Sequence, residues 1–357
     1  MSGRPRNVAF AAVAAALGLL LIEGISAVAL RFVGREAPLP VAERRHTRFD
    51  AELGWVNEPS RRVEDLYGPG RTLTTNSQGF RATRDYARAV PEGRVRLLCS
   101  GDSFTLGWGV DDAETWPARL EALDPRIETV NLGQGGYGVD QAYLWALREE
   151  DSLEHQVHLF AFILEDLQRM RYDRFREYGK PRLELRGDRP VAVGVPLDPP
   201  AAGNDAWWAA SRTARLLLRL AGRSAAPEPQ ARGPLSEAAR VAAAAVEDLH
   251  RIHDRNGTRL VAVWLPTLPE YLSRDMDVVR NTILQHLRGA GVTAYDLTGD
   301  LRALPPVDAD RLFLKPEDVV LPFHGRHYSA AGNEFVARAL WRRLERLPEF
   351  GGDGPGS

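Results

Sequence analysis

Hydrophobic positions fall into two recurring patterns over most of the chain. Short apolar runs that end in glycine, serine or proline are typical of buried strands, and apolar residues at every third or fourth position are typical of helices. The expected strands cover Val95–Cys99, Ile127–Leu132, Val157–Leu164, Arg259–Leu265 and Val292–Leu297. The expected helices cover Glu114–Leu123, Val139–Glu149, Ser236–Arg255, Val278–Leu287 and Ala330–Leu344.

This alternation of strands and helices predicts an α/β domain over residues 94–347. Parallel sheets of this kind are covered by helices on both faces. Ligands bind beyond the carboxyl ends of their strands. We therefore expect a five-stranded parallel sheet whose chemistry lies just after Cys99, Leu132 and Leu164.

The N-terminal pattern differs, because Val8–Leu30 is apolar throughout except for Glu23. A helix needs about 20 apolar residues to cross a bilayer. Residues 1–33 are therefore predicted to form a transmembrane anchor. The alternatives are a signal peptide cleaved after Ala29 and a buried core helix. A signal peptide has a shorter apolar region of about 7–15 residues, which favours the uncleaved anchor. We expect a single pass through a bacterial inner membrane, with the rest of the chain periplasmic or extracellular.

Three further segments lack a clear period. Residues 34–93 are rich in proline, arginine and turn residues, and are predicted to form a stalk and an irregular cap with a strand piece at Arg71–Thr75. Residues 196–234 are predicted to be an insertion that acts as a lid or surface excursion. Within it, Trp207 and Trp208 could stack on sugars or pack in the lid. Residues 348–357 are predicted to be a flexible tail.

Composition narrows the possible functions. The 357 residues are 44% hydrophobic and 26% charged, which is globular composition, and the net charge of −2 gives no general attraction to nucleic acid. The single cysteine, Cys99, excludes an internal disulfide. Apart from the pair His324 and His327, no ligand-spaced histidine cluster stands out, and no phosphate-cradling glycine motif does. No metal or nucleotide cofactor is therefore expected. The excess of arginine over lysine suggests a bacterial source.

The first strand is followed by Ser100-Gly101-Asp102-Ser103-Phe104-Thr105. A serine in a tight turn at this edge of the sheet is placed for nucleophilic attack, and backbone N–H groups of the turn can face a developing oxyanion. A polar turn that only closes the strand is an equally good interpretation. Asp102 is expected to bind turn amides rather than to act in catalysis.

A serine nucleophile needs a base. By elimination, only His324 and His327 precede the last helix in a loop that can return to Ser103. The other six histidines are expected elsewhere: in the stalk (His46), at the opposite end of the sheet (His155, His158) and on surface helices (His250, His253, His286).

Three motifs together resemble the SGNH/GDSL hydrolases: Gly101–Thr105, Asn131–Gly136, and the final His327-x-Ser329-x-x-Gly332-Asn333. This family contains serine esterases, lipases and carbohydrate O-acetyl esterases with a flavodoxin-like three-layer α/β/α fold. The resemblance covers roughly residues 94–347. Two further segments, Asn76–Arg81 and Gly107–Val110, resemble a membrane-anchored bacterial branch of the family.

The resemblance implies a role for each matching position. Ser103 corresponds to the nucleophile, and its own N–H to the first oxyanion donor. Gly136 corresponds to the second oxyanion donor, and His327 to the general base.

Two positions depart from the family pattern. Glu165 stands where the family has an asparagine as third oxyanion donor, and a carboxylate repels an oxyanion. Loss of one such donor costs about 10²–10³ in rate elsewhere. His324 stands where the family has the aspartate that orients the base. A main-chain carbonyl or a remote carboxylate is expected to take that role, the candidates being Asp308, Asp310 and Asp318.

The sequence therefore predicts an exported, membrane-anchored serine esterase. Its expected substrate is a short acyl ester, such as an O-acetyl group on a cell-envelope glycan. Two alternatives stay open: an acyltransferase or accessory protein for glycan O-acylation, and a catalytically degenerate glycan-binding protein.

Overall fold

The structure is a computed structural model that describes residues 4–32, 43–175, 178–199, 211–220, 231–321 and 326–352. The chain divides into two compact units. One contains residues 1–39 with 200–229, and the other contains residues 40–199 with 230–357. Trp207, Trp208 and the last five residues of the expected tail lie outside the described residues.

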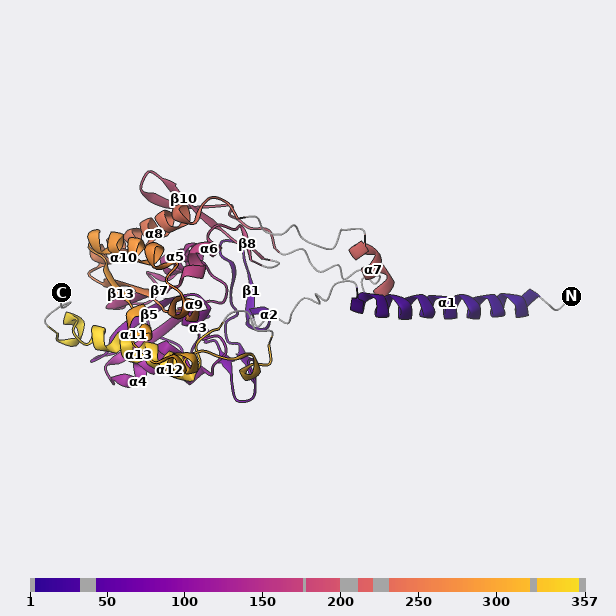
Figure 1. The fold of residues 1–357 in the computed structure, drawn as a ribbon, viewed down its shortest axis with the longest axis horizontal. Helices are drawn as coiled ribbons and strands as arrows, with labels where there is room; N and C mark the ends of the chain where they lie inside the picture. The colour runs from indigo at the N-terminus through magenta and orange to yellow at the C-terminus, as the bar shows by residue number, and fades with distance from the viewer. Residues whose placement is uncertain are drawn as a thin grey trace. The chain divides into compact units, whose positions relative to one another are not determined.

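The larger unit is built on the predicted five-stranded sheet (Figure 1). Its order is β13-β12-β7-β5-β6, and all four pairings are parallel, which confirms the expected α/β class. The strands are β5 (Val95–Gly101), β6 (Ile127–Gly133), β7 (Val157–Phe162), β12 (Arg259–Trp264) and β13 (Thr293–Asp296).

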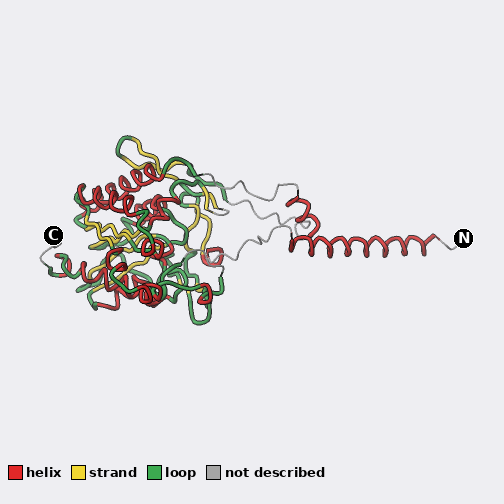
Figure 2. The backbone as a smooth tube through the Cα atoms, in the orientation of Figure 1, coloured by secondary structure: helices red, strands yellow, loops and turns green. Residues whose placement is uncertain are grey.

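Side chains alternate between two cores, one on each face of the sheet. Leu98 and Phe160 pack in one core, and their neighbours Leu97 and Leu159 pack in the other. The first face is covered by α5 (Val139–Glu149), α8 (Leu235–Asn256) and α10 (Asp277–Gly289). The second is covered by α4 (Trp116–Leu123), α11 (Thr298–Arg302), α12 (Pro306–Arg311) and α13 (Ala330–Leu344). Figure 2 shows the strands between these two groups of helices.

The third strand is shorter than its apolar run predicts. Leu164 begins α6 (Leu164–Arg169) because the Asp166 carboxylate accepts a hydrogen bond from the N–H of Ile163 at 3.0 Å and caps the helix. The expected helix from Glu114 also starts later. A short 3₁₀ turn over Asp112–Glu114 precedes Thr115, whose hydroxyl caps α4. Local side-chain capping sets both boundaries.

Residues 43–93 contain two short antiparallel strand pairs and belong to the same compact unit as the sheet. They begin with α2 (Glu43–His46), followed by β1 (Thr47–Asp50) paired with β2 (Gly54–Asn57) and β3 (Arg62–Val63) paired with β4 (Leu73–Thr74).

Two more short antiparallel pairs follow α6. In these, β8 (Arg174–Phe175) pairs with β9 (Tyr178–Gly179), and β10 (Arg182–Arg186) with β11 (Arg189–Val193). Pairs of two to five residues are too short for a period to be recognised in the sequence.

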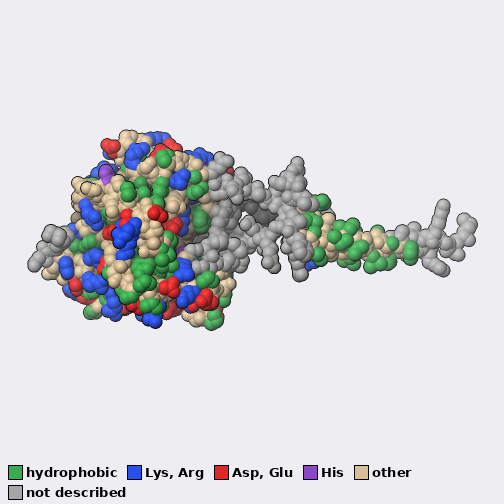
Figure 3. All heavy atoms as spheres, viewed as in Figure 1, with side chains coloured by type: hydrophobic (Ala, Val, Ile, Leu, Met, Phe, Trp, Pro, Cys, Tyr) green, Lys and Arg blue, Asp and Glu red, His purple; other side chains and the backbone are tan. Residues whose placement is uncertain are grey.

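The smaller unit contains α1 (Arg4–Phe32) and α7 (Arg212–Leu220). The carboxylate of Glu23 accepts hydrogen bonds from the Ser211 hydroxyl and from the N–H groups of Arg212 and Thr213, so the one charge of the apolar run caps α7. Large apolar side chains along α1, from Phe10 to Val28, are more than half exposed for the most part (Figure 3). Within the described ranges, no helix is long and apolar enough to cross a membrane.

Candidate active site

Ser103 is the first residue of a four-residue helix, α3 (Ser103–Leu106), directly behind β5. Asp102 caps this helix, since its Oδ1 accepts a hydrogen bond from the N–H of Phe104 at 2.8 Å. The cap fixes the turn as the sequence analysis expected for Asp102. Ser103 therefore lies at the carboxyl edge of the sheet, beside the central strands β5 and β7.

The structure brings Ser103 and His327 together across 224 residues of sequence. The Oγ of Ser103 lies 2.8 Å from Nε2 of His327 and 3.2 Å from Oδ2 of Asp102. A serine hydroxyl at this distance from an imidazole nitrogen has the geometry of a nucleophile and its base.

Aromatic rings enclose the imidazole of His327 on both faces. The Phe104 ring lies 4.8 Å from it at an interplanar angle of 32°, and the Trp108 ring lies 4.7 Å from it at 29°. The carbonyl of His327 also accepts a hydrogen bond from the N–H of Leu314 at 2.8 Å. Ring stacking and the backbone therefore orient this histidine.

A carboxylate partner for the other ring nitrogen is not found among the described residues. Nδ1 of His327 is buried there without a hydrogen-bond partner. The expectation that a main-chain carbonyl or one of three aspartates orients it is therefore wrong for this part of the chain. Those aspartates bind other groups: Asp308 the Arg311 side chain, Asp310 the Arg326 side chain, and Asp318 the Lys315 N–H. His324 lies outside the described residues.

The pKa of His327 is lowered to about 4, mainly by burial, with the charge of Asp102 raising it and the charge of Arg169 lowering it. Desolvation disfavours the imidazolium form. The ring is thus neutral near pH 7 and can accept a proton at Nε2.

Arg169 on α6, the helix that follows β7, forms hydrogen bonds to the turn between β5 and Ser103. Its Nη1 donates to Oδ2 of Asp102 at 3.0 Å, to the carbonyl of Tyr137 at 3.0 Å and to Oδ1 of Asp166 at 2.5 Å. Burial and the nearby Asp102 charge raise the pKa of Asp166 well above its usual range. These contacts give Asp166 and Arg169 a role in positioning the turn that carries Ser103.

Glu165 lies beside this network and takes no part in its hydrogen bonds. Its Oε2 is buried and has no partner within the described part of the chain. The described residues therefore offer no hydrogen bond to this oxygen of the carboxylate at the position where the resemblance implied an asparagine.

The turn after β6 presents Gly136 with a φ of +78°, a conformation that favours glycine. A Cβ atom there would meet the Phe175 ring at 2.4 Å. The carbonyl of the preceding Gly135 accepts a hydrogen bond from the Trp55 indole at 2.9 Å. Because this carbonyl and the N–H of Gly136 belong to one planar peptide unit, Trp55 fixes the direction of the N–H. Sequence reasoning missed Trp55, since the aperiodic segment around it carries no signal of contact with the sheet.

Arg81 holds the loop that carries Trp108. Its guanidinium is buried and donates to the carbonyls of Leu106, Gly107 and Val110 at 2.6–2.7 Å. It also pairs with Asp112 at 3.1 Å. Hydrogen bonds from Arg81 thus join the segments Asn76–Arg81 and Gly107–Val110. Together they support the Trp108 ring against the imidazole of His327.

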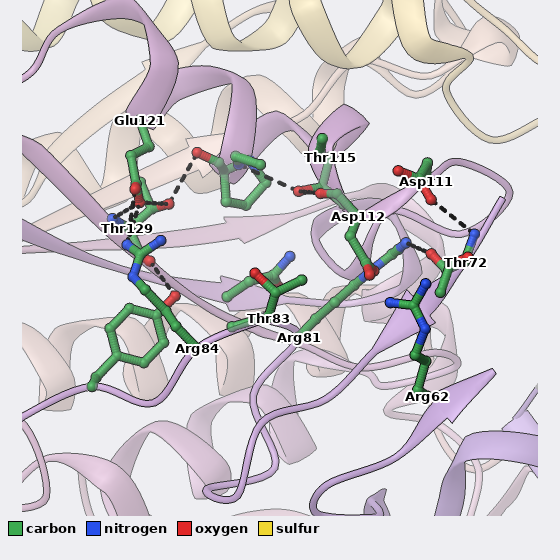
Figure 4. Close-up of a pocket in the computed structure, with 16 residues that line it drawn as sticks. Arg62, Thr72, Arg81, Thr83, Arg84, Asp111, Asp112, Thr115, Glu121 and Thr129 are labelled. Atoms are coloured by element: carbon green, nitrogen blue, oxygen red, sulfur yellow. Dashed lines mark hydrogen bonds and ion pairs between the residues drawn. The ribbon is translucent and has the colours of Figure 1, made fainter. Parts of the chain in front are cut away.

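Arg81 also borders a pocket of about 310 Å³ that contains neither Ser103 nor His327 (Figure 4). Three arginines and three carboxylates line the pocket, and two of the arginines pair with carboxylates of the same pocket. Arg84 forms two hydrogen bonds to Glu121, and Arg81 pairs with Asp112. This pairing leaves little positive charge for an anionic ligand.

Comparisons with known proteins give structural matches only. No family model and no curated protein matches the sequence. A member of the lipolytic protein G-D-S-L family from Veillonella parvula is 13% identical, with 71% of this chain and 100% of that chain covered at a TM-score of 0.40. The acetyl xylan esterase AlAXEase is 14% identical (70% and 98% covered, TM-score 0.39). The lipase/acylhydrolase from Enterococcus faecalis is 12% identical (70% and 95% covered, TM-score 0.37). Sequence identities and TM-scores this low do not establish an activity, so the functional conclusion depends on the geometry around Ser103.

Proposed function

We propose that this chain is a serine ester hydrolase of the SGNH/GDSL type. The observation that carries the proposal is the 2.8 Å contact between Ser103 Oγ and His327 Nε2 at the carboxyl edge of a parallel sheet. The imidazole, neutral near pH 7 because its pKa is lowered to about 4, and the oriented peptide of Gly136 add to it.

In this mechanism, Nε2 of His327 accepts the hydroxyl proton as Ser103 attacks the ester carbonyl. The N–H groups of Ser103 and Gly136 stabilise the tetrahedral oxyanion. His327 then gives the proton to the departing alcohol. Water, activated by the same histidine, hydrolyses the acyl-serine and releases the acid.

We further propose that the substrate is a short acyl ester, such as an O-acetyl group of a cell-envelope glycan. The motif resemblance supports this class, because it implies carbohydrate O-acetyl esterases among other members. The proposed location supports it as well. The apolar run Val8–Leu30, with its exposed side chains on α1, is proposed to hold the chain at a bacterial inner membrane with residues 40–357 outside the cytoplasm. Fractionation of cells, with and without residues 1–33, tests the location.

The function is tested with the purified full chain and its Ser103→Ala variant. The wild type is expected to hydrolyse p-nitrophenyl acetate and to react with a fluorophosphonate probe, and the variant to do neither while keeping its circular dichroism spectrum. Full activity in Ser103→Ala would overturn the assignment. If acylated product exceeds free acid when a sugar acceptor is supplied, the reaction is acyl transfer instead.

A second candidate is a catalytically degenerate glycan-binding protein. Two observations favour it: the unpaired carboxylate of Glu165 and the missing partner of His327 Nδ1 within the described residues. It predicts a folded wild type that is silent in both assays yet binds acetylated glycans on an array.

A further inference from the structure

A second group of titratable side chains lies at the amino-terminal edge of the sheet, the opposite edge from Ser103. Glu150 follows α5, His155 precedes β7, and His253 lies in the last turn of α8 before β12. One ligand atom from each of these three residues lies within 4.8 Å of those from the other two. The side chain of His253 is fully buried, and that of Glu150 is 8% exposed.

The distances within this group suit one small cation. Nδ1 of His253 lies 3.5 Å from Nε2 of His155 and 3.5 Å from Oε1 of Glu150. Ligands that are about 2.0–2.1 Å from a tetrahedral Zn²⁺ lie about 3.3–3.4 Å from one another. Two edges of the cluster are therefore close to those of a zinc tetrahedron.

The tautomer of His155 directs a lone pair into the cluster. Its Nδ1 lies 3.0 Å from the carbonyl of Leu153, which can only accept, so Nδ1 carries the proton. Nε2 of the neutral ring is then bare and faces His253. A ring nitrogen held by a backbone carbonyl while the other nitrogen is free is the common arrangement around metal-bound histidines.

His253 has a similar second partner. Its Nε2 lies 2.9 Å from Nδ1 of His158, whose Nε2 lies 2.7 Å from the Ser100 hydroxyl. When His253 carries its proton on Nε2, it donates a hydrogen bond to Nδ1 of His158, and His158 donates in turn to the Ser100 hydroxyl. The lone pair of His253 Nδ1 then points into the cluster. In the structure the hydroxyl of Thr258 lies at hydrogen-bond distance from this nitrogen, 2.7 Å, and a cation at Nδ1 would require it to donate instead to its other acceptor, the carbonyl of His253 at 3.4 Å.

Acceptors outnumber donors in the cluster. Oε1 of Glu150 accepts a hydrogen bond from Asn256 at 3.0 Å, but its Oε2 is buried and has no partner within the described residues. A buried carboxylate oxygen without a donor is costly. A divalent cation bound at Oε1 would neutralise this buried carboxylate and would also satisfy the lone pair of His155.

We propose that Glu150, His155 and His253 bind one Zn²⁺ ion. Two imidazoles and a carboxylate are a ligand set that zinc accepts, whereas Mg²⁺ prefers oxygen ligands and water. The ion would join the connection between α5 and β7 to the last turn of α8. The cluster lies at the edge away from Ser103, so the ion would stabilise the fold and take no part in ester cleavage. Sequence analysis missed this set because its members are separated by up to about a hundred residues and lie on one connection and one helix.

The proposal is tested on the full chain, purified with a histidine-free tag and freed of metal with a chelator. Titration with ZnCl₂ against a chromophoric chelator is expected to show one tightly bound Zn²⁺ per chain. Zinc is expected to raise the thermal midpoint by several degrees, and MgCl₂ at the same concentration to leave it unchanged.

Two ligand variants and two controls locate the ion. Glu150→Gln preserves the shape and the acceptor for Asn256, and His155→Asn keeps a donor for Leu153. Each is expected to weaken zinc binding at least tenfold and to abolish the thermal shift. His286→Asn alters an exposed histidine paired with Glu247 and is expected to bind like the wild type. His327→Gln is also expected to bind normally. Absence of zinc binding by folded wild type, or unchanged affinity in both Glu150→Gln and His155→Asn, would overturn the proposal.

Discussion

At the residue scale, the base of this site is oriented without a carboxylate among the described residues. Phe104 and Trp108 stack against the His327 ring. In a Ser-His-Asp triad the acid fixes the tautomer and stabilises the imidazolium. Stacking can fix the ring plane, but it supplies no negative charge. The predicted consequence is a weaker base with an unusually low pKa.

This low pKa leads to a testable pH profile. A general base works only when unprotonated, so activity is lost as pH falls through its pKa. With the pKa of His327 lowered to about 4, kcat/KM for p-nitrophenyl acetate is expected to be the same at pH 5.5 as at pH 7.5 within about twofold. A histidine with the ordinary value of 6.5 would lose about tenfold over that range. Stopped assays on protein shown to be folded at each pH distinguish the two.

Glu165 gives a second prediction at this scale. Its carboxylate, which has no partner for Oε2 among the described residues, stands where the SGNH/GDSL hydrolases that the motifs resemble have an asparagine donor, so Glu165→Asn replaces repulsion by a hydrogen bond to the proposed oxyanion. We expect kcat/KM to rise about tenfold or more, in line with the 10²–10³ that one oxyanion donor contributes elsewhere. Gln168→Asn, on an exposed position of the same helix, serves as the control. No gain in Glu165→Asn would favour the glycan-binding alternative.

At the element scale, sequence patterns predicted the elements that are long and periodic. The bounds of α5 and α13 agree with the expectation, and all five strands form where apolar runs occur. The elements that were missed depend on tertiary contacts. The pair β1 and β2 packs Trp55 into the core, and the loop after α3 is held by Arg81. Ser103 and His327 could be proposed from motifs, whereas the stacking of Trp108 and the hydrogen bond from Trp55 depend on segments without a period.

Replacing Arg81 by lysine is predicted to lower both the stability of the fold and kcat. Lysine has three donors on one nitrogen and cannot reproduce the planar fork of arginine. Arg81→Lys would leave at least two of its buried acceptors unmatched, at about 1–3 kcal/mol each. We expect the free energy of unfolding in urea to fall by about 2–4 kcal/mol and kcat to fall as Trp108 loses its support. Arg84→Lys, at a half-exposed ion pair with Glu121, is expected to change stability by less than about 1 kcal/mol.

At the scale of the whole molecule, buried neutral histidines tie stability to pH. Burial and the charge of Arg81 lower the pKa of His46 to about 3, and burial lowers that of His327 to about 4. Both titrate near 6.5 in the unfolded chain. The unfolded state therefore binds more protons below pH 6.5, and the folded state loses stability as the pH falls.

Each of these histidines is expected to contribute a slope of up to about 1.4 kcal/mol per pH unit below pH 6.5. Asp166, with its raised pKa, contributes in the opposite sense, so a difference between variants is the cleaner measurement. Urea unfolding followed by tryptophan fluorescence from pH 7.5 to 5.5 should show a shallower slope for His46→Gln than for the wild type. His286→Gln should match the wild type, and equal slopes in all three would contradict the prediction.

The hydrogen bond from Trp55 to Gly135 limits how far the chain can be shortened without disturbing the proposed site. A fragment that starts at residue 94 would retain Ser103, Gly136 and His327, together with the three motifs Gly101–Thr105, Asn131–Gly136 and His327–Asn333. It would nevertheless lose the indole that aims one oxyanion donor and the guanidinium that supports the ring over the base. The smallest fragment expected to keep the geometry of the proposed site therefore begins near Trp55, some fifty residues before Gly101.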